Sequence, residues 1–263
     1  MKVSDKSIII IFLLPVLVSL ASCINTKQVT YFNDAADTAY IDAPGANENI
    51  IHNNDILSIT INSLNAEASA VFNTTNNFVI NSSTASGSAT QSTGYLVNID
   101  GSIQLPILGN IKAAGLTKTQ LKDLITQTII SKKLLVDPVV NIRHLNFEVT
   151  VIGEVGRPTV ITVPNEKISM IKALGLAGDI TIYGQKNNVL LIRESSGKKK
   201  LVRLDLQSTS FIKSPYYYLM PNDVVYVEPN KNRIASVSRG HQLIPSLLYT
   251  LSVVAVIIIN RVN

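Results

Sequence analysis

Three aspartates, Asp55, Asp100 and Asp223, are the acidic side chains most open to a chemical role. Two carboxylates that flank a glycosidic bond can serve as general acid and base, so a close pair would indicate a glycan-modifying enzyme. Each of the three, however, stands beside Asn or Gly at a predicted turn, where a carboxylate accepts hydrogen bonds from nearby backbone amides. We therefore interpret them as turn-forming residues, with a catalytic pair as the alternative.

The rest of the chain offers no pattern that is typical of catalysis or of cofactor binding. The histidines, His52, His144 and His241, are widely spaced, and no metal-ligand motif joins them to carboxylates. The run Tyr216-Tyr217-Tyr218 presents aromatic faces that suit sugar rings, although tyrosines on a strand more commonly pack into a core. We expect no enzyme activity, no cofactor and no metal.

Cys23, the sole cysteine, has the clearest chemistry in the sequence. It follows a basic start and a hydrophobic run over residues 8–20, which is too short for a comfortable transmembrane helix and is typical of a signal peptide. Leu20-Ala21-Ser22-Cys23 has the order of a bacterial lipobox, in which the thiol is joined to diacylglycerol and the chain is cut before the cysteine. We predict a signal peptide over residues 1–22 and a lipid, of the palmitate type, on Cys23. The alternatives are an inert buried thiol or an uncleaved anchor.

The net charge of +5 is only mildly basic and does not indicate a nucleic-acid partner. The basic residues are scattered except for Lys198-Lys199-Lys200, which stands between two strand-like runs and favours a solvated hairpin turn over a phosphate-binding patch. With no second cysteine, an internal disulfide is impossible, so the fold depends on packing alone.

Two successive units of mixed helix and strand are expected to position these residues, which predicts an α+β fold. Residues 23–50 are polar and irregular and predict a lipidated tether, and residues 73–94 predict a long loop. In the first unit, over residues 51–145, we expect strands at 56–61 and 139–143, a hairpin of 95–98 with 102–105, and a helix at about 118–131 that begins at a Thr117 to Gln120 capping box. In the second unit, over residues 146–230, we expect strands at 147–152, 159–163, 189–193, 201–206 and 224–227, and a helix at 168–176 with Gly178 at its end. Asn54-Asp55 and Asn222-Asp223 each precede a strand, which indicates that the two units share one kind of turn.

Residues 231–263 form a C-terminal linker and a hydrophobic segment at about 243–259. The segment is at the short limit for a helix that crosses a bilayer, and a buried core helix is the alternative. Its position between cations and its apolar residues on every side favour a membrane helix. Ser246, Tyr249 and Thr250 lie on neighbouring faces of such a helix and are candidates to line a pore if several copies form a closed ring.

Taken together, these segments resemble the polysaccharide biosynthesis/export family of outer-membrane lipoproteins. The resemblance rests on Asp55-Ile56-Leu57-Ser58-Ile59, on Tyr95 to Gly109, on Gly115-Leu116-Thr117 and on Val151 to Pro158. The last of these looks like the opening of a soluble-ligand-binding β-grasp (SLBB) domain, and Tyr218 to Val224 looks like its close. The family motifs would include these structural residues: Asp55, Asp100, Gly101, Pro106, Gly109, Gly153, Pro158, Pro221 and Asp223.

The resemblance implies a homo-oligomeric ring that exports capsular polysaccharide or exopolysaccharide from the periplasm to the cell surface. Its lipid would sit in the outer membrane, most of the chain would hang in the periplasm, and an inner-membrane chain-length regulator or tyrosine-kinase-type copolymerase would dock beneath it. The family's usual Gly before the strand-entry aspartate is Asn54 here, and only one β-grasp unit is evident. A monomeric, membrane-anchored sugar-binding or scaffolding lipoprotein is the alternative function.

Overall fold

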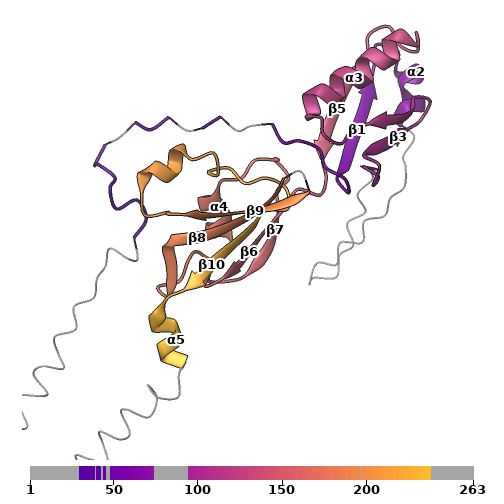
Figure 1. The fold of residues 1–263 in the computed structure, drawn as a ribbon. Helices are drawn as coiled ribbons and strands as arrows, with labels where there is room; N and C mark the ends of the chain where they lie inside the picture. The colour runs from indigo at the N-terminus through magenta and orange to yellow at the C-terminus, as the bar shows by residue number, and fades with distance from the viewer. Residues whose placement is uncertain are drawn as a thin grey trace, which may run out of the picture.

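The computed structural model describes residues 30–38, 40–42, 44–45, 48–73, 94–195 and 197–237. These ranges contain two hydrophobic cores, one built between Ile51 and Val140 and the other between Phe147 and Val227. We call the parts of the chain around them the first unit and the second unit. Figure 1 shows the two units next to each other, joined where strand β5 (Val139–His144) leads into strand β6 (Glu148–Gly153). Both units combine helices with strands, as the sequence predicts.

The first unit is a small antiparallel sheet covered by one long helix. The sheet has the order β2-β1-β5, and a separate hairpin pairs β3 with β4. The elements besides β5 are β1 (Ile56–Asn62), α2 (Ala66–Ala70), the 3-10 helix η2 (Val71–Asn73), β2 (Tyr95–Leu96), β3 (Ser102–Leu105), β4 (Gly109–Lys112) and α3 (Lys118–Ser131). Helix α3 buries Leu121, Ile125 and Ile129, one turn apart, and both hydrogen bonds of the predicted capping box form at its start.

The predicted hairpin of residues 95–98 with 102–105 is wrong. The turn itself forms, since the Gly101 amide donates to the Asn98 carbonyl at 2.8 Å. Beyond it, however, β3 pairs with β4, whereas β2 pairs with β1. The cause is a second turn after Pro106, where Ile107 and Gly109 have φ of 64° and 82° and return the chain onto β3.

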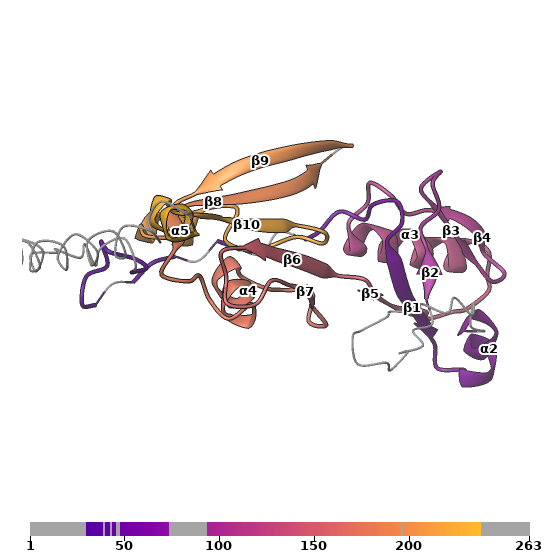
Figure 2. The ribbon, with the colours of Figure 1, turned by 90° about the horizontal axis from the view of Figure 1, so that it is seen from below.

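The second unit is a five-stranded mixed sheet with one helix on a face, as Figure 2 shows. Its order is β7-β6-β10-β8-β9. The strands that come first and last in the chain, β6 and β10, are neighbours in the sheet and run parallel, and all other neighbouring pairs are antiparallel. This is the strand order of a β-grasp sheet. The remaining elements are β7 (Thr159–Thr162), α4 (Met170–Leu176), β8 (Gly184–Ser195), β9 (Lys198–Leu204), the 3-10 helix η3 (Thr209–Lys213), β10 (Val224–Pro229) and α5 (Lys231–Val237). The lysine run begins β9 directly after the hairpin turn, where Gly197 has a φ of 72°.

A short stretch near the N-terminus is docked on the second unit, although the sequence predicted only an irregular tether there. We call residues 30–35 the N-terminal strap. The amides of Phe32 and Asn33 donate to the carbonyls of Leu206 and Gln207 at 3.3 and 2.6 Å. From the strap the chain runs across to the first unit (Figure 1), where the Glu48 carboxylate accepts from the Thr119 amide at 2.9 Å and Ile51 enters the core. The two units are therefore linked twice by the chain.

Several predicted features lie outside the described residues. These are the lipidation site Cys23 and the hydrophobic segment 243–259 with Ser246, Tyr249 and Thr250. Within the ranges that the structure does describe, none of the helices has both the length and the apolar character needed to cross a bilayer.

Candidate functional site

The two Asn-Asp turns have the same geometry, one at the start of β1 and one at the start of β10. Asn54 and Asn222 both adopt the left-handed conformation, with φ of 68° and 64°. The carboxylates of Asp55 and Asp223 are both buried, and each accepts a hydrogen bond from the backbone amide three residues earlier, at 2.7 and 2.8 Å. This confirms the predicted shared turn chemistry, and it shows asparagine in a backbone conformation that glycine more usually adopts.

In the second unit, the turn carboxylate is neutralised by arginine. Arg193, on the neighbouring strand β8, donates to Asp223 through Nε at 2.9 Å and through Nη2 at 2.6 Å. Nη2 also donates to the Tyr218 carbonyl at 3.2 Å, and the guanidinium lies 5.4 Å from the centre of the Tyr216 ring. The buried charges are thus paired and hydrogen-bonded in two-point geometry, which gives them a structural role.

In the first unit, the equivalent carboxylate faces a histidine. His144 Nδ1, on β5, lies 3.7 Å from Asp55 Oδ2, beyond hydrogen-bond distance, and neither ring nitrogen of this buried side chain has a hydrogen-bond partner. Burial lowers the pKa of His144, against the opposing effect of Asp55, and burial likewise raises the pKa of Asp55. This pair therefore lacks the direct hydrogen bonds that join Asp223 to Arg193.

His144 also marks the junction between the units. Its backbone amide donates to the carboxylate of Glu166, which lies in the turn between β7 and α4 of the second unit. The same carboxylate forms an ion pair with Lys118, the first residue of α3 in the first unit. Glu166 thus contacts both the strand and the helix of the neighbouring unit, and it was not singled out from the sequence because its partners are distant along the chain.

Asp100 stands at an exposed turn of the first unit. Its carboxylate accepts from the Ser102 amide at 3.0 Å and from the Ser102 hydroxyl at 2.8 Å, and these bonds lower its pKa. Gly101 has a φ of 80°, as the predicted Asp-Gly turn requires. The three aspartates that could have formed a catalytic pair thus contact three different sets of residues, and each is used in a turn.

The other predicted motif residues also take positions in turns. Gly153 ends β6 with a φ of 97°, and a Cβ at this position would overlap the carbonyl oxygen of Val227 on β10. Pro158 precedes β7, and Pro221 stands in the turn that leads to Asp223. These residues shape the edges of the strands and carry no reactive group.

The N-terminal strap covers a buried lysine that the sequence did not reveal. The Lys186 ammonium lies 4.8 Å from the centre of the Tyr31 ring and donates to the Ile180 carbonyl at 3.3 Å. Burial lowers the pKa of Lys186. The Tyr31 hydroxyl donates to Asp179, and burial raises the pKa of Tyr31. The strap therefore completes the packing of this end of the second unit.

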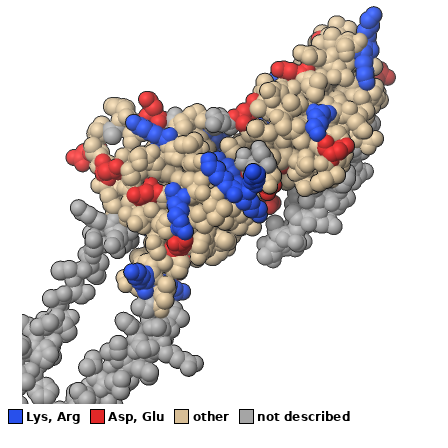
Figure 3. All heavy atoms as spheres, viewed as in Figure 1, with Lys and Arg blue, Asp and Glu red and all other residues tan. Residues whose placement is uncertain are grey.

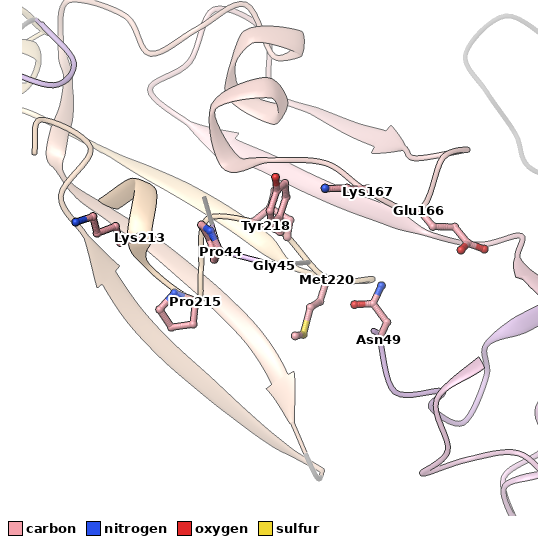
Figure 4. Close-up of a pocket in the computed structure, with 10 residues that line it drawn as sticks. Pro44, Gly45, Asn49, Glu166, Lys167, Lys213, Pro215, Tyr218 and Met220 are labelled. Atoms are coloured by element: carbon pink, nitrogen blue, oxygen red, sulfur yellow. The ribbon is translucent and has the colours of Figure 1, made fainter. Parts of the chain in front are cut away.

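A pocket of about 230 Å³ opens where three distant segments meet (Figure 4). It is lined by residues from the segment before β1, from the turn between β7 and α4, and from the loop after η3: Pro44, Gly45, Asn49, Glu166, Lys167, Lys213, Pro215, Tyr218, Leu219 and Met220. The Lys167 ammonium lies 4.5 Å from the centre of the Tyr218 ring. Figure 4 shows the Glu166 carboxylate pointing away from this ring, toward the junction.

All three tyrosines of the run are half-buried, and Tyr216 and Tyr217 pack against the core of the second unit. The ring centres of Tyr217 and Phe211 are 5.7 Å apart, and Tyr216 and Tyr218 each have a cation over the ring. Across the described part of the chain, no group of three or more His, Cys, Asp and Glu side chains is arranged to hold a metal ion. The site is thus a pocket with aromatic, apolar and basic walls at the junction of two α+β units.

Fold and site together define a two-unit protein whose acidic residues are used to build turns and ion pairs. Residues 43–145, which contain the first core, match the polysaccharide biosynthesis/export protein family. Over this domain, the chain is therefore similar to that family.

Two curated relatives carry the name EPS I polysaccharide export outer membrane protein EpsA. The protein from Ralstonia solanacearum is 30% identical over 142 residues, which cover 53% of this chain and 37% of the relative. The protein from Ralstonia nicotianae is 31% identical over 150 residues, which cover 56% of this chain and 38% of the relative. The matched region thus spans well under half the length of either relative.

Proposed function

We propose that this chain is an outer-membrane lipoprotein subunit of a ring-shaped translocon that exports capsular polysaccharide or exopolysaccharide from the periplasm to the cell surface. The observation that carries the proposal is the match of residues 43–145 to the polysaccharide biosynthesis/export family, since this stretch contains one complete hydrophobic core. The names of the two relatives support the outer membrane as its location.

Both described ends of the chain lie at one end of the second unit, which supports attachment to a single membrane. Tyr31 of the strap contacts Asp179, and Arg233 of α5 approaches Glu154 at 3.5 Å. Asp179 and Glu154 lie near each other, because the hydroxyl of Thr181, two residues after Asp179, donates to Glu154 at 2.8 Å. An extended chain spans about 3.5 Å per residue, so a lipid on Cys23 would lie within roughly 25 Å of Thr30. In this arrangement the second unit is near the membrane and the first unit hangs further into the periplasm.

The second unit is proposed to be an SLBB domain, on the strength of its β-grasp strand order. One helix cannot enclose a channel, so export through residues 243–259 would require several copies in a closed ring, with Ser246, Tyr249 and Thr250 toward the lumen. An inner-membrane chain-length regulator or copolymerase would meet the first unit from below.

Deletion of the gene tests the function directly. We expect surface polysaccharide to disappear while intracellular synthesis continues, and unchanged surface polysaccharide would contradict the proposal. Imaging of the detergent-solubilised protein tests the ring, which must appear as a large symmetric particle. A monomeric particle would favour the sugar-binding or scaffolding lipoprotein instead.

The lipid has its own test in the Cys23→Ser variant. Mass spectrometry of the wild-type N-terminus should find an acylated Cys23, and the variant should lose its membrane attachment. An unmodified Met1 on the wild-type protein would rule out the lipid anchor.

A further inference from the structure

The junction pocket combines an aromatic wall with a cation that has no carboxylate partner among the described residues. Lys167 is exposed, and its ammonium is held over the Tyr218 ring. Tyr216 precedes Tyr218 by two residues in the loop after η3, and it too lies beside a lysine. The ammonium of Lys200, on β9, lies 5.3 Å from the centre of the Tyr216 ring. Figure 3 shows basic side chains gathered on the face of the second unit that borders the first.

The acidic residues closest in sequence to Lys167 and Tyr218 are already engaged. The Glu166 carboxylate accepts from Lys118 and from the His144 amide. Asp223 is neutralised by Arg193. Lys167 therefore presents a positive charge at the pocket that no carboxylate among the described residues satisfies, and an external anion is the natural partner.

The remaining walls suit a pyranose ring. Pro44, Pro215, Leu219 and Met220 are apolar, and Tyr218 adds an aromatic ring, while the Asn49 amide can donate and accept hydrogen bonds. A sugar ring has an apolar face of C–H groups and hydroxyls at its rim, so it matches a pocket that is apolar and aromatic with a few polar groups. The volume of about 230 Å³ lies below the range of pockets for drug-sized ligands, which begins near ~300 Å³. It therefore suits a single sugar residue.

We propose that this pocket binds one carboxylate-bearing sugar unit of an acidic polysaccharide, with its carboxylate on Lys167 and its apolar face against Tyr218. The inference deepens the proposed export function and rests on it for the source of the ligand. It makes the junction between the units a contact point for the chain in transit, and it makes charge on the polysaccharide a determinant of which polymer binds.

The test compares two probes that share one sugar backbone and differ in whether their carboxyl groups are charged: a fluorescently labelled oligogalacturonate and its fully methyl-esterified form. Fluorescence anisotropy with the full-length protein in detergent should show tighter binding of the oligogalacturonate. Lys167→Gln should weaken that binding roughly tenfold, the value of one charge-assisted hydrogen bond, and should leave the weaker binding of the ester unchanged. Tyr218→Leu should weaken both probes, because it removes the aromatic wall that they share. Lys122→Gln, on the exposed face of α3 in the first unit, is the matched control and should bind both probes as the wild type does.

Equal binding of the two probes, binding of neither, or equal affinities in Lys167→Gln and Lys122→Gln would overturn this inference. Such results leave the export function standing, because gene deletion tests that function independently. Conversely, charge-dependent binding through Lys167 combined with unchanged surface polysaccharide after deletion would retain the site and refute export.

Discussion

The two Asn-Asp turns are alike in backbone and differ in the partner of the carboxylate, so the same substitution should have different costs in the two units. Asp223→Asn leaves the Arg193 guanidinium buried without a counter-charge. Breaking a buried ion pair from one side costs about 3–5 kcal/mol. The lower end of about 3 kcal/mol applies here, because Arg193 keeps its bond to the Tyr218 carbonyl and its contact with the Tyr216 ring.

Asp55→Asn should be far milder. Burial already disfavours the charged form of Asp55, and the lowered pKa of His144 leaves an uncharged imidazole opposite it. The asparagine oxygen can still accept from the His52 amide, so we expect a loss of about 1 kcal/mol or less.

Native-state hydrogen exchange measures both effects in one experiment, because amides of β1 and β5 report on the first unit and those of β6 and β10 on the second. Replacing the pair together, in Asp223→Asn with Arg193→Met, should recover most of the stability that Asp223→Asn loses. Equal losses from Asp55→Asn and Asp223→Asn, or no recovery in the double variant, would refute the reasoning.

Three further predictions concern pH, backbone strain and the strap. Acidification from pH 7.5 to 5.5 should lower the free energy of unfolding, because unfolded His144 takes up a proton near its ordinary pKa of 6.5 whereas the folded residue does so only at lower pH. In urea titrations, His144→Gln should lose this dependence of the unfolding free energy on pH. Asp55 acts in the opposite sense: its raised pKa contributes stability that is present below 3.8 and is lost as pH rises through the folded value, so Asp55→Asn should remove that more acidic phase. Gly153→Ala should cost roughly 2–4 kcal/mol by urea unfolding, because it adds overlap with Val227 to the strain of a positive φ, whereas Gly197→Ala, at a φ of 72° in open space, should cost only about 1 kcal/mol. Asp34→Ala should speed protease cleavage within the strap, because Asp34 accepts from the Thr209 amide at 2.6 Å and from the Ser208 hydroxyl at 3.0 Å, and cleavage no faster than in Asp37→Ala would contradict the docked strap.

Sequence patterns correctly predicted the structural features that depend on hydrogen bonds between residues close together in the chain. The Thr117 capping box, the left-handed Asn54 and the paired turns at Asp55 and Asp223 all depend on bonds within a few residues, so their signals are contained in short stretches. The outcome of the Asp100-Gly101 turn was harder to predict, because the strand after it had two possible partners and a second turn decided between them.

Long-range pairings could not be read in the same way. His144 and Arg193 face their aspartates only because of strand register, and the pocket combines segments around residues 45, 167 and 218. One available signal was Arg193 itself, a cation at the end of the apolar run Val189-Leu190-Leu191-Ile192, which indicates a buried charge that needs a partner. The strap carried no comparable signal. Its backbone bonds to residues 206 and 207 are independent of side-chain type, and the partners of its Tyr31 and Asp34 side chains lie more than 140 residues away along the chain.

The docked strap also has a mechanical consequence. Any tension applied to the chain ahead of Thr30 meets the hydrogen bonds of residues 32–34 to residues 206–209 before it reaches β1. Those bonds connect the strap to the segment from the end of β9 to the start of η3, so the load passes into the five-stranded sheet. The first unit therefore bears no load from the N-terminus until the bonds of the strap break.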